Sequence, residues 1–123
     1  MPYVVDREAF EEMVADALDS MPDELAKRME NVVITVEDTA SAEQARGHRG
    51  TLLGLYQGIA LTRRTPNTYN RALPDRITIF RLPHCRIAAD EQSLRDRVRV
   101  TVLHEVGHHF GISDERLREL GWA

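Results

Sequence analysis

The stretch "HEVGHHFGISD", residues 104 to 114, places three histidines, a glutamate and an aspartate within eleven positions. On a helix that turns about 100° per residue, His104 and His108 differ by about 40° in direction and one turn in height. Two imidazoles placed in this way can both reach one zinc ion, each at about 2.0–2.1 Å. Glu105 lies about 60° from His108, near enough to contact a metal-bound water without being a ligand. The spacing therefore predicts His104 and His108 as zinc ligands and Glu105 as a general base.

The third protein ligand has to come from outside this helical turn. His109 points about 140° from His104 and cannot join the same site without breaking the helix. Gly111 stands where a helix commonly ends in the left-handed conformation, and a sharp turn there would bring Asp114 back toward the metal. Asp114 is therefore the predicted third ligand and Glu115 its nearest rival, with the fourth position left to water.

Two other interpretations of this stretch are less consistent with the sequence. One class of zinc site takes a glutamate from a second helix about twenty or more residues further on. Only 15 residues follow His108, so that arrangement is not expected here. The other interpretation is a helix whose histidines merely pack or face solvent, and it leaves Gly111 followed by Asp114 unexplained. Nitrogen and oxygen ligands in a tetrahedral arrangement favour zinc as the metal.

Length and composition indicate an ordinary single domain over residues 1–123. Hydrophobic residues make up 42% and charged residues 29%, which is typical of soluble globular proteins. The net charge of −4 gives no reason to expect binding to nucleic acid or to an anionic membrane. The first residues lack a signal-peptide pattern, and Cys85 has no second cysteine to pair with. We therefore expect a cytoplasmic protein.

The first half of the chain predicts two helices, a strand and a loop. Asp6 is a plausible N-cap for a helix, and Pro22 suits the first turn of a second, short one. The β-branched run at 32–37 predicts a strand, and the polar segment 39–50 predicts a loop. The apolar positions that give the first helix its period are Phe10, Met13, Val14, Ala17, Leu18 and Met21.

The second half is less regular. Residues 51–63 predict either a hairpin or one long strand with a bulge at glycine, followed by a loop at 65–75. "RITIFRL", residues 76–82, alternates and predicts a strand that Pro83 stops. Residues 91–110 are predicted helical, because the metal motif requires a helix and Asp90 can cap it. "RVRVTV" within that span would pass as a strand if it stood alone, so tertiary packing must stabilise this helix.

The stretch at 104–114 matches His-Glu-x-x-His-x-x-Gly-x-x-Asp, the aspartate variant of the metzincin pattern. With "LLGLYQGIAL", "LPDRITIFR" and "SDERLRELGW", the chain resembles the small bacterial zincin-like metallopeptidases of minimal size over roughly residues 50–122. The resemblance implies a two-layer α+β fold, with a small mixed sheet and the active-site helix packed on one face. It also implies a zinc held by His104, His108 and Asp114, with Glu105 as the catalytic glutamate.

The chain departs from the wider metzincin class after the motif. All four methionines lie upstream of it, so no methionine turn can lie beneath the metal. The residues after Asp114, "ERLRELGWA", offer no tyrosine for the oxyanion. The metal site is therefore expected to be complete and the substrate site reduced.

Other chemically suggestive residues have plainer interpretations. His84 and Cys85 would point to opposite faces of an extended chain, and a small buried thiol is preferred to a nucleophile. His48 lies in a polar loop and is expected to be solvated. Tyr56 and Tyr69 could donate to an oxyanion, but packing and loop roles are preferred. The arginines at 95, 97 and 99 spread around the helix, so a phosphate-binding row is not expected.

Together these features predict a zinc-dependent hydrolase, a metallopeptidase acting on a peptide or protein substrate. The strand beside the active-site helix, either "LLGLY" or "RITIF", would align an extended peptide by backbone pairing. Two alternatives remain: a metal-binding regulatory protein with weak turnover, and a zinc-dependent nuclease. Small bacterial RNA-processing enzymes of the second kind use three histidines without the glutamate, so Glu105 and the acidic chain count against it. The oligomeric state is left open.

Overall fold

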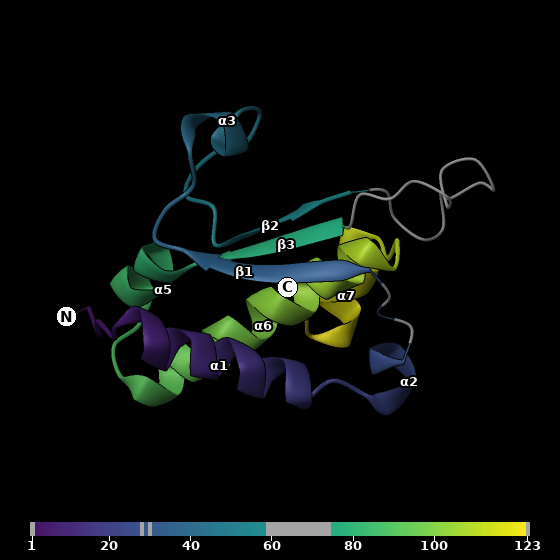
Figure 1. Ribbon diagram of the computed structural model, residues 1–123, viewed down its shortest axis with the longest axis horizontal. Helices are drawn as coiled ribbons and strands as arrows, with labels where there is room; N and C mark the ends of the chain where they lie inside the picture. Colours follow the sequence, from purple (N-terminus) through teal and green to yellow (C-terminus); the bar gives the residue numbers. More distant parts are fainter. Residues whose placement is uncertain (1, 28, 30, 59–74, 123) are drawn as a thin grey trace.

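A computed structural model describes residues 2–27, 29, 31–58 and 75–122. Its described part has two layers, a three-stranded mixed sheet and two long helices against one face of that sheet (Figure 1). The strands are β1 (Val32–Glu37), β2 (Gly54–Gln57) and β3 (Asp75–Phe80). They lie in the order β1-β3-β2, with β1 parallel and β2 antiparallel to the central β3. This architecture confirms the α+β fold with a small mixed sheet and a helix on one face.

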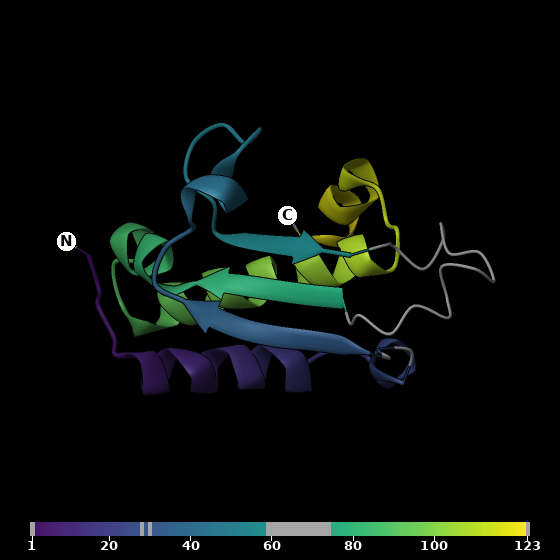
Figure 2. The ribbon, with the colours of Figure 1, turned by 45° about the horizontal axis from the view of Figure 1, so that its top comes forward.

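The two long helices are α1 (Arg7–Asp19) and α6 (Glu91–His109), which lie beside each other under the sheet (Figures 1 and 2). Asp6 caps α1 by accepting a hydrogen bond from the Ala9 amide at 2.8 Å. Asp90 caps α6 in the same way, accepting from the Ser93 amide at 2.7 Å. Both predicted helices and their caps are confirmed. No helix within the described residues has the length and apolar character needed to cross a bilayer.

The core lies between the sheet and these helices. Strand alternation directs Ile77 and Ile79 of β3 toward the helices, where both are fully buried. Val98, Val102 and Val106 of α6 are buried as well, and they provide the tertiary packing that holds β-branched residues in a helix. The apolar side chains of α1 that complete this core are Phe10, Met13, Val14 and Ala17.

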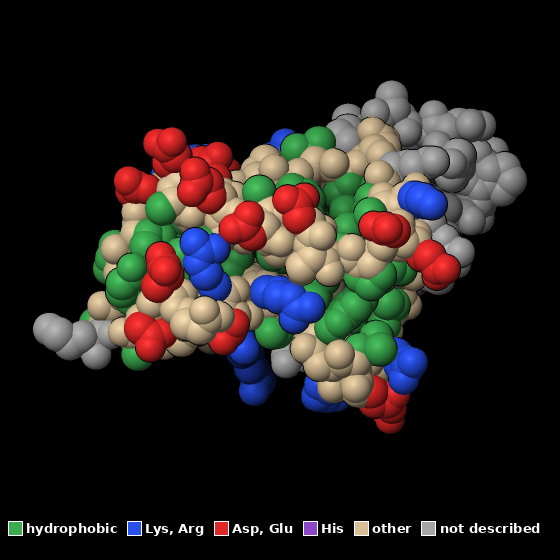
Figure 3. All heavy atoms as spheres, turned by 90° about the horizontal axis from the view of Figure 1, so that it is seen from below, with side chains coloured by type: hydrophobic (Ala, Val, Ile, Leu, Met, Phe, Trp, Pro, Cys, Tyr) green, Lys and Arg blue, Asp and Glu red, His purple; other side chains and the backbone are tan. Residues whose placement is uncertain are grey.

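The lower surface of the molecule carries mixed charge. Acidic and basic side chains lie among one another there, with apolar patches between them (Figure 3). Arg95 of α6 pairs with Asp16 of α1 at 3.1 Å, an exposed contact that links the two helices. Exposed pairs of this kind contribute little to stability, so burial of the core accounts for most of the packing between the helices.

Short helices appear where the sequence predicted other structure. The loop predicted at 39–50 contains α3 (Ala42–Ala45), a single turn that Ser41 and Gln44 stabilise as a capping box. The strand predicted at 76–82 ends at Phe80, because α5 (Arg81–Ile87) begins there and takes Pro83 into its first turn. A proline is tolerated at this position because the first amides of a helix have no intrahelical partner. The prediction that Pro83 stops the strand is therefore wrong.

The remaining predictions agree with the structure where it describes them. The second helix, α2 (Asp23–Ala26), follows Pro22, and the strand at 32–37 is β1. Of the hairpin or long strand expected at 51–63, the structure shows β2. The rest of that segment, and the loop expected at 65–75 up to residue 74, lie outside the described residues.

Candidate metal centre and the adjacent cleft

The last turns of α6 bring three potential metal-binding side chains together. His104, Glu105 and His108 each offer a nitrogen or carboxylate oxygen, and these ligand atoms all lie within 4.8 Å of one another. The two imidazole rings have centroids 4.5 Å apart and planes inclined at 71°. The helical spacing of His-Glu-x-x-His therefore brings the two predicted ligands and the predicted general base into one cluster.

A turn after α6 returns the chain toward this cluster. Gly111 has φ of +75°, the left-handed conformation expected at the end of a helix. The turn is closed by two backbone hydrogen bonds, from the Gly111 amide to the His108 carbonyl at 3.0 Å and from the Ile112 amide to the Gly107 carbonyl at 2.9 Å. The next helix, α7 (Asp114–Leu120), begins directly afterwards, with Ser113 as its cap.

Gly107 lets α7 approach α6 closely. A β-carbon at this position would collide with the side chain of Leu117, which is fully buried between the two helices. Because α7 packs this closely, its first residue lies over the end of α6. Asp114 Oδ1 is 3.1 Å from His108 Nε2 and 3.9 Å from His104 Nε2.

The distances of Asp114 from His104 and His108 fit a zinc ion shared by the three side chains. Two ligands of a tetrahedral zinc at about 2.0–2.1 Å lie about 3.3–3.4 Å from each other. The measured separations of 3.1 and 3.9 Å from Asp114 to the two histidines bracket this value. His104 donates from Nδ1 to the Trp122 carbonyl at 3.0 Å, which leaves the lone pair of Nε2 directed away from that bond. Within the described residues, the carboxylate of Glu115 contacts neither histidine.

Two carboxylates surround His108 and control its charge. Glu105 Oε1 lies 3.1 Å from Nδ1, and Asp114 Oδ1 lies 3.1 Å from Nε2. The hydrogen bond with Glu105, together with that to Asp114, raises the pKa of His108 to about 9. The same contact with His108 lowers the pKa of Asp114. This negative environment favours a positive charge at the centre of the cluster, which either a proton or a metal cation can supply.

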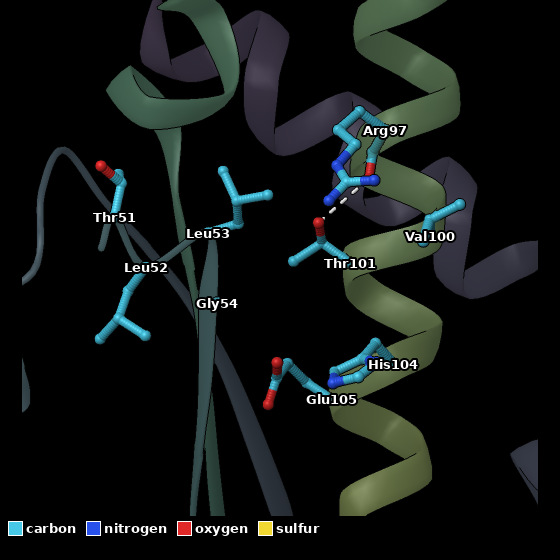
Figure 4. A pocket seen from close by; sticks show the side chains of 9 residues that line it. All are labelled: Thr51, Leu52, Leu53, Gly54, Arg97, Val100, Thr101, His104 and Glu105. Carbon is cyan, nitrogen blue, oxygen red and sulfur yellow. Dashed lines mark hydrogen bonds between the residues drawn. The ribbon is translucent and has the colours of Figure 1, made fainter. Parts of the chain in front are cut away.

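A cleft of about 230 Å³ opens beside the cluster (Figure 4). One wall is the chain that leads into β2, and the other is a face of α6. Gly54 brings the walls together, because a β-carbon there would lie 2.8 Å from Thr101 Cγ2 and 3.1 Å from Glu105 Cγ. The residues that line the cleft are Thr51, Leu52, Leu53, Gly54, Arg97, Val100, Thr101, His104 and Glu105.

Comparison with known proteins gives the family. The model of the zincin-like metallopeptidases matches residues 29–122. The chain belongs to this family. The match covers most of the chain and begins upstream of the region that carries the sequence resemblance. No curated protein matches significantly.

A solved structure shares the fold of this zincin-like protein. It is a conserved hypothetical protein from Thermus thermophilus, superimposed with a TM-score of 0.57 at 22% sequence identity. The alignment covers 94% of this chain and 99% of that one. At this identity the similarity supports the zincin-like fold alone.

A buried histidine supports the cleft wall from behind. His84 donates from Nδ1 to the Phe80 carbonyl at 2.7 Å, and its Nε2 lies 2.8 Å from the hydroxyl of Thr101. Burial, together with the charge of Arg97, lowers its pKa to about 4, although the bond to Phe80 opposes this. His84 is therefore neutral at pH 7, with Nε2 as the acceptor. Thr101 also lies 3.1 Å from the Arg97 carbonyl, as the dashed line in Figure 4 shows.

The prediction that His84 and Cys85 lie on an extended chain, with side chains on opposite faces, is wrong. Both residues lie in helix α5 instead of an extended segment, and both side chains are buried. The buried thiol predicted for Cys85 is confirmed. His48 is exposed, as expected, and Tyr69 lies outside the described residues.

His109 lies outside the ligand cluster, as its direction on the helix predicted. Its Nδ1 donates to Asp75 Oδ2 at 2.9 Å, and the hydroxyl of Tyr56 donates to the same oxygen at 2.6 Å. The hydroxyl of Tyr56 is thus bonded to Asp75 and not to the candidate metal ligands. This network joins β2, β3 and the last residue of α6, next in sequence to His108.

Sequence reasoning missed several residues that shape the site. Gly54 carried a usable signal, because an interior glycine in an apolar strand often marks a close backbone approach. Asp75 carried none, since it is 34 positions from its partner His109 and stood at the end of a predicted loop. The hydrogen bond between His104 and Trp122 could not be predicted either, because Trp122 makes it with its backbone carbonyl.

Proposed function

We propose that this protein is a zinc-dependent peptidase in which His104, His108 and Asp114 hold the metal. The observation that carries the proposal is the arrangement of these three side chains, with Asp114 Oδ1 3.1 and 3.9 Å from the two imidazoles. The family supports the same chemistry, since its members are described as zincin-like metallopeptidases.

Glu105 is the proposed general base. Zinc, when bound, polarises a carbonyl and lowers the pKa of its water to about 7. Glu105 is only 6% exposed, lies beside His108 and lines the cleft. Its carboxylate can therefore take a proton there and pass it to the leaving amine. His104 is held in place by the Trp122 carbonyl, which fixes its ring orientation.

The substrate on this proposal is an extended segment of a peptide or protein. β3 is the central strand, so "RITIF" cannot offer a free edge, whereas β2 lies at the edge of the described sheet. β2 also lies against α6 at the cleft. A peptide can pair with its backbone there and pass over Glu105.

The test compares Glu105→Gln with wild type after both are loaded with zinc. The variant should retain its zinc and lose about 10²–10⁴-fold in the rate of peptide cleavage, because only the proton acceptor is removed. Glu115→Gln, in the next helix, is the matched control and should cleave at the wild-type rate. Equal rates for Glu105→Gln and wild type would refute the catalytic role. If zinc-loaded wild type binds peptides and cleaves none, the chain is a binding protein on a zincin fold.

A further inference from the structure

We propose that Arg97 selects substrates that carry a carboxylate on the C-terminal side of the cleaved bond. The carboxylate belongs either to an aspartate or glutamate side chain or to the C-terminus of the peptide. This inference rests on the proposed peptidase function and adds a substrate class to it.

The cleft has opposite charges at its two ends. Figure 4 shows Arg97 at one end and Glu105 with His104 at the other, all from α6. Arg97 and Glu105 are eight positions apart, which corresponds to about 12 Å along the helix. The walls between them carry uncharged side chains, among them Leu53 and Val100. A ligand that fills the cleft from the reacting end therefore meets a cation at the far end.

Arg97 differs from the neighbouring arginines in what it contacts. Arg95 pairs with Asp16 at 3.1 Å, and Arg99 donates to the Ser20 hydroxyl at 3.2 Å, so both belong to the contact between α6 and α1. Arg97 instead lines the cleft, and no acidic side chain of the described residues lies within ion-pair distance of its guanidinium. A planar guanidinium in this position matches the geometry of a carboxylate.

Strand direction places the carboxylate on the C-terminal side. β2 runs in the same direction as α6 (Figure 2), because Gly54 lies by Thr101 and the ring of Tyr56 lies 5.8 Å from that of His109. Antiparallel pairing, the more stable kind, makes a bound peptide run opposite to β2. Its C-terminal part then points from Glu105 toward Arg97.

The length of the cleft limits how far the carboxylate stands from the cleaved bond. An extended peptide advances about 3.3–3.6 Å per residue, so about 12 Å corresponds to three or four residues. In Figure 4 the side chain of Arg97 extends from its backbone toward Thr101 and Glu105, which shortens this span. The carboxylate is therefore expected within about three residues of the cleaved bond.

The test measures binding to zinc-loaded Glu105→Gln, which should not consume its ligands. A peptide that wild type cleaves in a mixed library supplies the cleavage site. Labelled peptides are then compared in pairs, with Glu against Gln at each of the next three positions and a free C-terminus against an amide. The charged member of one pair should bind about tenfold more tightly. The pair that shows the difference identifies the source of the carboxylate.

Adding Arg97→Gln should abolish the preference, whereas Arg99→Gln should leave it intact. Arg97→Lys keeps the positive charge and should retain part of the preference for the charged peptide. Equal binding within every pair, or a preference that survives Arg97→Gln, would overturn the inference while leaving the peptidase function standing. If wild type cleaves no library peptide, the peptidase function fails, and this inference fails with it.

Discussion

His109 Nδ1 lies 2.9 Å from Asp75 Oδ2, and the two side chains are 0% and 6% exposed. The contact joins the residue after a predicted zinc ligand to the first residue of the central strand. Because the hydroxyl of Tyr56 donates to the same oxygen, the edge strand β2 is tied to the same point. A polar network therefore links the edge strand β2 and the central strand β3 to the end of α6.

Removing the acid from this network should destabilise the fold strongly. We expect Asp75→Ala to lower the free energy of unfolding by about 3–5 kcal/mol, because the ring of His109 stays fully buried after the carboxylate is removed. Urea denaturation measures the change. Arg116→Ala is the control, since its pair with Glu119 is exposed and should cost about 1 kcal/mol or less. Similar losses in the two variants would show that the buried network contributes no special stability.

Replacing His109 distinguishes a role in stabilising the fold around the site from a role as a metal ligand. His109→Ala should reduce stability but leave the zinc stoichiometry unchanged, because its ring contacts Asp75 and not the ligand cluster. Elemental analysis of the folded variant gives the answer. Loss of the zinc from a folded His109→Ala protein would show that the helix geometry assigned to the motif is wrong.

Contact between the cleft walls can be tested at Gly54. Gly54→Ala should cost about 1–3 kcal/mol, because the new methyl group meets Thr101 Cγ2 at 2.8 Å. Thr101→Ser removes that methyl group and keeps the hydroxyl that contacts His84. The penalty of Gly54→Ala should therefore be smaller in the Thr101→Ser background, as a double-mutant cycle of unfolding free energies would show. Additive effects would mean that the clash is relieved elsewhere.

The buried His84 predicts a dependence of stability on pH. Its pKa falls from 6.5 to about 4 on folding, so the unfolded chain binds more protons between these values. The contribution of His84 is fully present above pH 6.5 and decreases as the pH falls toward 4, by about 3 kcal/mol in total. Unfolding experiments from pH 4 to 7 should show this slope in wild type and a shallower one in His84→Gln. Identical slopes would exclude His84 as the cause.

The sequence predicted most of what is local. The helix at 91–110 was recovered in spite of the β-like "RVRVTV", because the spacing of His104 and His108 requires a helix and Asp90 caps it. The turn at Gly111 was equally readable, since only a few residues favour its conformation. Helix α5 was missed because Pro83 is compatible both with the end of a strand and with the first turn of a helix.

What the sequence could not supply depends on contacts between distant segments. The meeting of Asp75 and His109 depends on the packing of β3 against α6, for which neither residue carries a local pattern. The separation of Arg97 from Arg95 and Arg99 was anticipated as a spread around the helix. The sequence could not show that Arg97 lines a cleft, because the opposite wall is the distant segment that leads into β2.

Zinc binding is the most direct test of the metal centre proposed at His104, His108 and Asp114. Protein purified without chelator should contain about one zinc per chain, and His104→Ala none, since two histidines and one carboxylate are the minimum set for such a site. Asp114→Ala should weaken zinc binding in a titration far more than Glu115→Ala, because Asp114 Oδ1 lies 3.1 Å from His108 Nε2. Equal effects of the two substitutions would show that the third ligand is misassigned. Wild-type protein that takes up no zinc, even when zinc is supplied, would contradict the account as a whole.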